Sequence, residues 1–119
     1  EQDMPICATC VRVPVYIGHG ESVNVEFDSP MSSKEAREIL SMAPGIKVMD
    51  NPEKDIYPLP VQSEGTDDVF VGRIRQDVSH SNSLAIWVVA DNLRKGAALN
   101  AVQVAEIVVK EEALIQYRR

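Results

Sequence analysis

The sequence predicts an α+β fold, with a mixed or antiparallel sheet and helices on one face. The expected elements follow one another as strands, helix, strands and helix, without internal repeats or low-complexity tracts. The 119 residues are 45% hydrophobic and 25% charged, which is ordinary for one soluble domain that buries a core. Order and composition together therefore favour a single small domain.

The first two strands are expected on either side of residues 18–20. Residues 10–17 form an apolar, strand-like run, and residues 21–27 alternate polar and apolar side chains as a half-buried strand does. Proline removes a ladder donor and glycine accepts unusual dihedrals. A bulge or turn is therefore predicted between Pro14 and Gly18.

A short helix is expected over residues 34–42, where Ala36, Ile39 and Leu40 have helical spacing. Serines and a proline before it supply caps and a breaker, and the Pro-Gly pair after it ends the helix.

Residues 46–49 predict a further strand. Residues 50–68 contain several prolines and many acids, and they predict a long surface loop. Residues 69–75 then predict a strand, with Arg73 and Arg75 two apart on one exposed face.

The last part of the chain predicts a turn, a strand and a helix. Residues 76–83 are polar and suit a turn, and residues 84–89 suit a buried strand. Asp91 or Asn92 is expected to cap a long helix whose apolar positions continue through Leu114.

Charge and termini limit the possible functions. The net charge of −6 and the isoelectric point near 4.8 argue against nucleic acid or an anionic membrane as a partner. No apolar run is long enough for a membrane span, and no signal peptide is recognisable. The chain begins with Glu1, so we expect a fragment or a processed product, and the low cysteine content favours the cytoplasm.

Cys7 and Cys10 have the C-x-x-C spacing of zinc and dithiol sites. A zinc site needs two more ligands, and His19 and His80 stand at spacings that match no zinc finger. A dithiol site needs a helix after the pair, whereas a strand is expected. We therefore expect no metal and predict that both thiols fill a core as small apolar groups.

Arg12 and His19 interrupt an apolar track, so each must face water, a partner or a ligand. A guanidinium can bind a carboxylate through two parallel hydrogen bonds, and an imidazole can transfer a proton near neutral pH. An extended chain between them would span about 23 Å, so one shared site requires the predicted bend. The alternatives are a salt bridge for Arg12 and a structural role for His19.

Residues 91–98 open the last helix, where free backbone donors can receive an anion or a polar amide. The alternative is a helix cap followed by small residues for close packing. The chain carries no glycine-rich nucleotide motif and no nucleophile with an adjacent base.

Three segments, in this order, resemble bacterial aspartate-semialdehyde dehydrogenases: CVRVPVYIGHGESVNVEF at 10–27, VGRIR at 71–75 and WVVADNLRKGAALN at 87–100. The resemblance runs from about Cys7 into the last helix and so covers nearly the whole chain. It implies an oxidoreductase that uses NADP to interconvert L-aspartyl-4-phosphate and L-aspartate 4-semialdehyde. This reaction belongs to lysine, methionine, threonine and diaminopimelate biosynthesis.

The resemblance also implies roles for single residues. His19 matches the general acid and base, Arg12 matches the arginine that binds the substrate α-carboxylate, and Asn92 matches the amide residue near the nicotinamide. Family members use a cysteine nucleophile from a region that would precede Glu1, and Cys10 does not match it. Many relatives have serine in place of Gly20.

For the architecture, the resemblance implies an incomplete C-terminal domain like that of glyceraldehyde-phosphate dehydrogenase. Residues 1–90 would form the second part of the substrate and dimerisation domain of a homodimer or homotetramer. Residues 91–119 would form a helix that packs on a nucleotide-binding domain absent from this chain. The chain alone is therefore expected to be inactive. The alternatives are a free-standing dimerisation module and a small-acid-binding module without catalysis.

Overall fold

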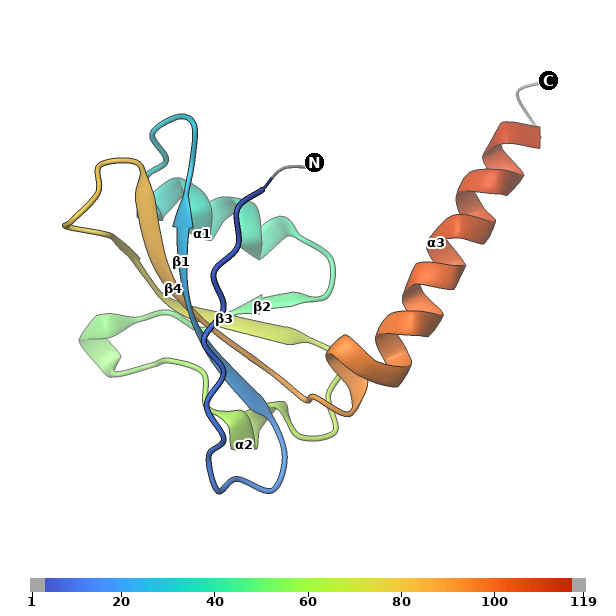
Figure 1. The fold of residues 1–119 in the computed structure, drawn as a ribbon, viewed down its shortest axis with the longest axis horizontal. Helices are drawn as coiled ribbons and strands as arrows, with labels where there is room; N and C mark the ends of the chain where they lie inside the picture. The colour runs from blue at the N-terminus through green and yellow to red at the C-terminus, as the bar shows by residue number, and fades with distance from the viewer. Residues whose placement is uncertain (1–3, 117–119) are drawn as a thin grey trace.

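The computed structural model describes residues 4–116, with side chains described as far as Glu111. Four strands form one mixed sheet in the order β1-β4-β3-β2 (Figure 1). β1 (His19–Glu26) and β3 (Val69–Gln76) each pair antiparallel with β4 (Ser83–Ala90), and β2 (Ile46–Val48) pairs parallel with β3. The predicted α+β class and mixed sheet are confirmed.

α1 (Ser33–Met42) covers one face of the sheet. The Ser32 hydroxyl accepts a hydrogen bond of 3.1 Å from the backbone N–H of Glu35, which satisfies one of the free donors of the first turn. Ala36 is buried against a core cluster that also contains Val71, Ile74 and Leu84. The helix predicted over residues 34–42 is confirmed, and its buried face closes the hydrophobic core on this side.

The strand register identifies the residues on the opposite face of the sheet, because successive side chains of a strand point to opposite faces. Val23 pairs with Ile86 and Val25 with Leu84 on the α1 side. The other side, here called the outer face, includes Ser22, Asn24 and Glu26 of β1, Arg75 of β3, and Ala85 and Trp87 of β4.

The connection between β2 and β3 is partly structured, whereas a plain loop was predicted. It contains η1 (Pro52–Lys54) and the single-turn helix α2 (Pro60–Ser63). The Trp87 indole N–H donates a 2.9 Å hydrogen bond to the carbonyl of Pro58. This bond ties the connection to the Trp87 side of the sheet.

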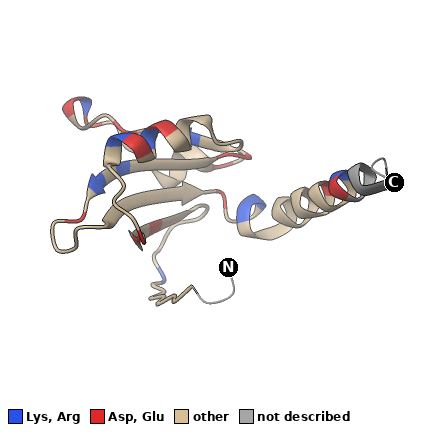
Figure 2. Cartoon of the chain, turned by 90° about the horizontal axis from the view of Figure 1, so that it is seen from above, with Lys and Arg blue, Asp and Glu red and all other residues tan. Residues whose placement is uncertain are grey.

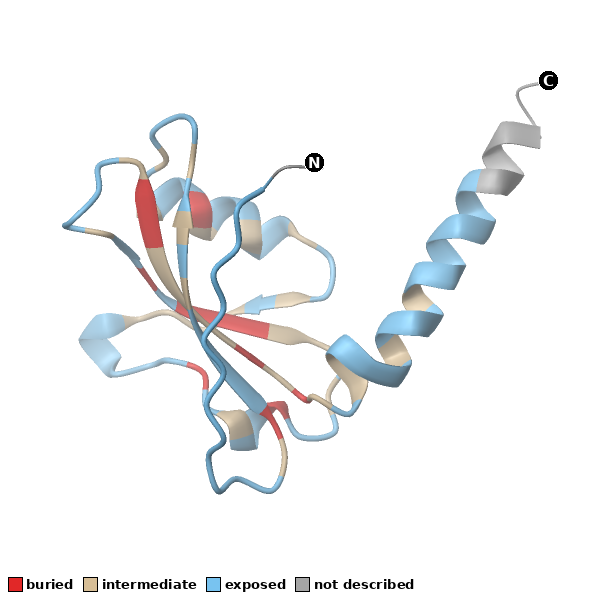
Figure 3. Ribbon diagram, in the orientation of Figure 1, coloured by how far each residue is buried: buried red, intermediate tan, exposed pale blue. Residues whose placement is uncertain are grey.

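The strand predicted over residues 10–17 is wrong. This segment is irregular and exposed, with bends at Pro14, Tyr16 and Ile17 (Figure 3). Its Val and Tyr residues favour extended chain, but no described strand lies alongside to supply ladder hydrogen bonds. The bend predicted between Pro14 and Gly18 is confirmed.

The predicted start of the last helix at residue 91 or 92 is also wrong. A kinked turn, η2 (Arg94–Ala98), has non-helical dihedrals at Lys95, Gly96 and Ala97, and α3 (Leu99–Gln116) begins after it. α3 projects away from the sheet and is largely exposed (Figures 1 and 3). The side chain of Leu114 lies outside the described residues. No described helix is both long and apolar enough to cross a membrane.

A β-bulge interrupts β3, where the pairing with β4 shifts between Gly72 and Arg75. Arg73 adopts a left-handed backbone with φ of 51°, a conformation that costs about 1–2 kcal/mol in a residue with a Cβ atom. The buried Asp50 carboxylate offsets this cost. It accepts hydrogen bonds from the backbone N–H of Arg73 at 2.7 Å, from that of Ile74 at 3.3 Å, and from Arg37 Nε at 2.6 Å.

We predict that Asp50→Ala lowers the free energy of unfolding by about 3 kcal/mol, because it removes the ion pair of the part-buried Arg37 guanidinium and leaves two backbone donors unpaired. Urea denaturation followed by circular dichroism measures the change. Lys34→Ala is the matched control, since the Lys34–Glu38 pair is exposed on α1 and its loss should cost less than about 0.5 kcal/mol. Equal effects of the two substitutions would contradict the role of Asp50.

Candidate functional site

One end of the sheet gathers two of the three predicted site residues. His19 is the first residue of β1 and pairs with Ala90, the last residue of β4. Asn92 follows two positions after Ala90, and its side-chain Oδ1 accepts a 2.9 Å hydrogen bond from the backbone N–H of Gly18. The Asn92 amide therefore holds the residue that directly precedes His19.

Gly18 turns the chain into β1. Its φ is +91°, a value that residues with a Cβ atom rarely adopt. A Cβ atom at this position would also lie only 2.9 Å from the Cβ atom and the carbonyl oxygen of Pro60. Both constraints require glycine here. The resulting turn places His19, whose side chain is exposed, at the start of β1.

Asp91 cross-links the same end of the sheet. Its side chain is buried and accepts hydrogen bonds from the backbone N–H of Gly65 at 2.8 Å and from that of Leu93 at 2.9 Å. These bonds, the one from Gly65 foremost, lower the pKa of the Asp91 carboxyl below its ordinary value. The ionised carboxylate thus fastens the loop after α2 to the end of β4, directly beside Asn92. Sequence reasoning gave Asp91 only a capping role, because nothing in the sequence links it to Gly65.

Trp87 closes over Gly20, on the face of β1 next to His19. A Cβ atom added at Gly20 would overlap Cη2 and Cζ2 of the Trp87 indole. The indole is restrained by its hydrogen bond to Pro58, so the space above Gly20 is already filled. The structure thereby answers why this position is glycine in this chain.

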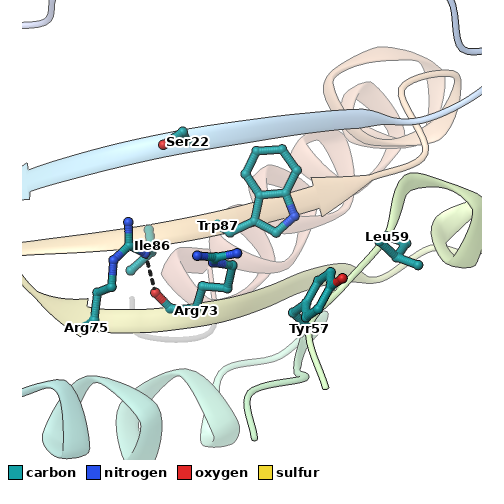
Figure 4. Close-up of a pocket in the computed structure, with 7 residues that line it drawn as sticks. All are labelled: Ser22, Tyr57, Leu59, Arg73, Arg75, Ile86 and Trp87. Atoms are coloured by element: carbon teal, nitrogen blue, oxygen red, sulfur yellow. Dashed lines mark hydrogen bonds between the residues drawn. The ribbon is translucent and has the colours of Figure 1, made fainter. Parts of the chain in front are cut away.

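Arg12 is not joined to the other two residues. It lies on the irregular segment before β1, is exposed, and forms no hydrogen bond or ion pair with any residue whose side chain the structure describes, residues 4–111. Neither Arg12 nor His19 lines the described hollow on the outer face (Figure 4). A common site for Arg12 and His19 therefore stays a prediction.

The two cysteines do not fill a core. Cys7 and Cys10 are both exposed and unbonded, so that expectation is wrong. The physical reason is that residues 4–17 lie outside the sheet instead of forming one of its strands. Among the side chains that the structure describes, no three His, Cys, Asp or Glu residues converge as metal ligands.

The comparison with known proteins agrees with this geometry. Residues 1–95 match the family model described as semialdehyde dehydrogenase, dimerisation domain. The chain belongs to the semialdehyde dehydrogenase family. It is 54% identical over 111 residues to the aspartate-semialdehyde dehydrogenase of Aquifex aeolicus, which covers 93% of this chain and 33% of that protein. For the Synechocystis enzyme of the same name, the identity is 50% over 109 residues, with 92% and 32% covered.

Solved structures of semialdehyde dehydrogenases support the same fold. Aspartate semialdehyde dehydrogenase II from Vibrio cholerae, complexed with ASA, gives a TM-score of 0.75 at 43% identity and covers 82% of this chain and 29% of that one. A probable aspartate-semialdehyde dehydrogenase from Pseudomonas aeruginosa gives 0.71 at 34% identity, with 82% and 28% covered. The predicted family is confirmed, and the chain spans about a third of the length of the curated relatives it matches.

We predict that Gly20→Ser displaces the Trp87 indole and lowers the free energy of unfolding by about 1–3 kcal/mol, the usual cost of overpacking. Trp87 is the single tryptophan of the chain, so its emission spectrum reports the displacement directly. Ser22→Ala, at the position that pairs with Trp87, is the matched control that adds no volume. An unchanged spectrum in Gly20→Ser would show that the indole does not restrict this position.

Proposed function

We propose that this chain is the C-terminal part of an NADP-dependent aspartate-semialdehyde dehydrogenase, here called the full-length enzyme. This enzyme would interconvert L-aspartyl-4-phosphate and L-aspartate 4-semialdehyde in the biosynthesis of lysine, methionine and threonine. One observation carries the proposal. His19 and Asn92, which the family resemblance matches to the acid–base residue and the amide near the nicotinamide, meet at one end of the sheet through Gly18.

His19 would act as the general base and acid. An imidazole at the start of a strand, with an exposed side chain, can reach a substrate and exchange protons near neutral pH. We propose that it accepts the proton of a thiohemiacetal hydroxyl as hydride leaves, and then assists attack of phosphate on the thioester. The thiol for this intermediate would belong to a cysteine in the preceding part of the full-length enzyme.

Arg12 would bind the substrate α-carboxylate. Its guanidinium carries no protein partner among the described residues, so both of its parallel donors are free for a carboxylate. The bends at residues 14–17 turn the chain between Arg12 and His19, which a shared substrate requires. A carboxylate fixed in this way would aim the aldehyde carbon at the nucleophile.

Asn92 would hold the carboxamide end of NADP, which supplies the hydride acceptor when bound. Its Oδ1 is occupied by the Gly18 N–H, so its Nδ2 is the group left to donate to a ligand. A carboxamide oxygen suits such a donor. The residue is half-buried, which leaves one side of the amide accessible.

The proposal also covers assembly. The match to a dimerisation domain supports self-association, with a homodimer or homotetramer as the working form. Within α3, Val102, Val104 and Ile107 are each more than half exposed, which supports packing of residues 91–119 on a nucleotide-binding domain. Two exposed, unbonded cysteines suit a reducing compartment such as the cytoplasm.

In the full-length enzyme, we predict that His19→Asn lowers kcat by about 10²–10⁴-fold with little change in KM, because it removes only the proton transfer. Arg12→Lys should instead raise KM about tenfold, because a point charge loses the bidentate grip on the carboxylate. Steady-state kinetics of NADPH formation separate the two. Near wild-type kcat in His19→Asn would remove His19 from the chemistry.

We predict that residues 1–119 alone form no NADPH from aspartate semialdehyde, phosphate and NADP, because they lack a nucleophile with an adjacent base. The assay follows absorbance of NADPH at enzyme concentrations that would reveal a few turnovers. The full-length enzyme serves as the positive control. Sustained turnover by the chain alone would contradict the assignment of the nucleophile to the preceding part.

A further inference from the structure

The β1–β4 ladder stops at His19, one residue short of Gly18. The last pair of the ladder joins His19 and Ala90, and the antiparallel register would set Gly18 opposite Asp91. Both carboxylate oxygens of Asp91 accept other hydrogen bonds, and its carbonyl oxygen accepts from the backbone N–H groups of residues 94 and 95 at 3.1 and 2.8 Å. Asp91 is therefore committed to its own loop and turn, and another acceptor must serve the buried Gly18 N–H.

The side chain of Asn92 is that acceptor. Its Oδ1 accepts the Gly18 N–H at 2.9 Å. Before this point, residues 4–17 form only one hydrogen bond with the described part of the chain, the local one from the Val15 N–H to the carbonyl of Val13. The Asn92 amide therefore makes the first long-range hydrogen bond of the chain, directly before β1 begins.

The backbone around Asn92 is fixed independently of this bond. On one side, the Asp91 carboxylate binds the backbone N–H of Gly65. On the other side lies the basic turn between β4 and α3 (Figure 2, blue), where Arg94 forms an ion pair with Asp67. Because contacts hold the chain on both sides of Asn92, its side chain projects from a fixed position.

A carboxamide is planar, so its oxygen and its nitrogen are oriented together. The Gly18 N–H needs an acceptor, which assigns Oδ1 of Asn92 to this contact and directs Nδ2 away from it. A group that binds Nδ2 restrains the same plane and so, through Oδ1, the start of β1. A bound group and the position of His19 are thus linked in both directions, because coupling between two sites is reciprocal.

We infer that Asn92 is the positioning residue for His19, and that a carboxamide held by its Nδ2 locks the start of β1 through Gly18. Asn92 acts on His19 only through the backbone, since its contact is with the preceding residue. This role rests on the proposed function and gives each end of the amide its own task. The nitrogen binds the cofactor, and the oxygen aligns the acid–base group.

Hydrogen exchange in the full-length enzyme tests the link without turnover. Two variants are matched for this purpose: Asn92→Asp keeps an acceptor for the Gly18 N–H and removes the donor, whereas Asn92→Leu removes both. The Gly18 amide should exchange at least about tenfold faster in Asn92→Leu than in wild type, and no faster in Asn92→Asp. Saturating NADP should slow this exchange in wild type and leave it unchanged in Asn92→Asp. Mass spectrometry of peptides that end on either side of Gly18 measures the rates.

A double-mutant cycle in kcat tests whether the link reaches His19. Asn92→Leu should lower kcat by at least about tenfold more than Asn92→Asp, because a displaced base is poorly aligned. Each variant is compared at its own pH optimum, so that the charge introduced by Asn92→Asp does not enter. In the His19→Asn background the two variants should have equal kcat, since no imidazole remains to be positioned. The KM for NADP should rise equally in both, because both lose Nδ2.

The outcomes separate this role from the proposed function. Equal kcat in Asn92→Leu and Asn92→Asp, with a raised KM for NADP in both, overturns the positioning role and leaves Asn92 as a cofactor contact. An unchanged KM for NADP in both variants overturns that contact and the link with it. Near wild-type kcat in His19→Asn overturns the base and therefore both claims.

Two further results decide the remaining cases. Additive losses in the cycle assign Asn92 to a step other than proton transfer and overturn the positioning role. If Asn92→Leu does not fold, the exchange of the Gly18 amide decides alone. Slowing by NADP in wild type but not in Asn92→Asp supports the link, and no effect of NADP in wild type overturns it.

Discussion

The antiparallel pairing of β4 with β1 on one side and β3 on the other determines where the functional groups of this chain lie. It sets His19 opposite Ala90, so the start of β1 and the end of β4 share one edge of the sheet. It also sets Ser22 and Gly72 on either side of Trp87. A shift of one residue in this register would exchange the two faces, moving Val23 and Val25 out of the core and Trp87 into it.

Around this register, short polar contacts convert a sheet edge into a defined site. Asp91 and Asn92 are adjacent, but they bind different parts of the chain: Asp91 holds the loop at Gly65, and Asn92 holds Gly18. Both acceptors bind backbone N–H groups, so the bonds fix chain direction and leave the side chain of His19 free. Such backbone anchoring is what an exposed acid–base residue needs, because its own imidazole must remain available for substrate.

Sequence patterns predicted the elements whose stabilisation is local. The helix over 34–42 carries its own cap and stop, and the strand near 21–27 shows its burial by alternation, so both were correct. The strand over 10–17 failed because it has no neighbouring strand. The helix start at 91 failed because non-helical dihedrals at Lys95, Gly96 and Ala97 interrupt the chain before α3, while Asp91 divides its hydrogen bonds between Leu93 and the distant Gly65. His19 and Asn92 were identified by family resemblance, whereas their link through Gly18 joins positions 74 residues apart and leaves no local signal.

The composition of α3 extends this reasoning beyond the sheet. Ile107 and Val109 are exposed on different sides of the helix, because positions i and i+2 of an α-helix are rotated by about 200° from each other. Val102 and Val104, which are also exposed, have the same spacing. A helix that is apolar on several sides gains little from lying on one flat surface, since one side always remains in water. α3 therefore requires a groove or more than one neighbour.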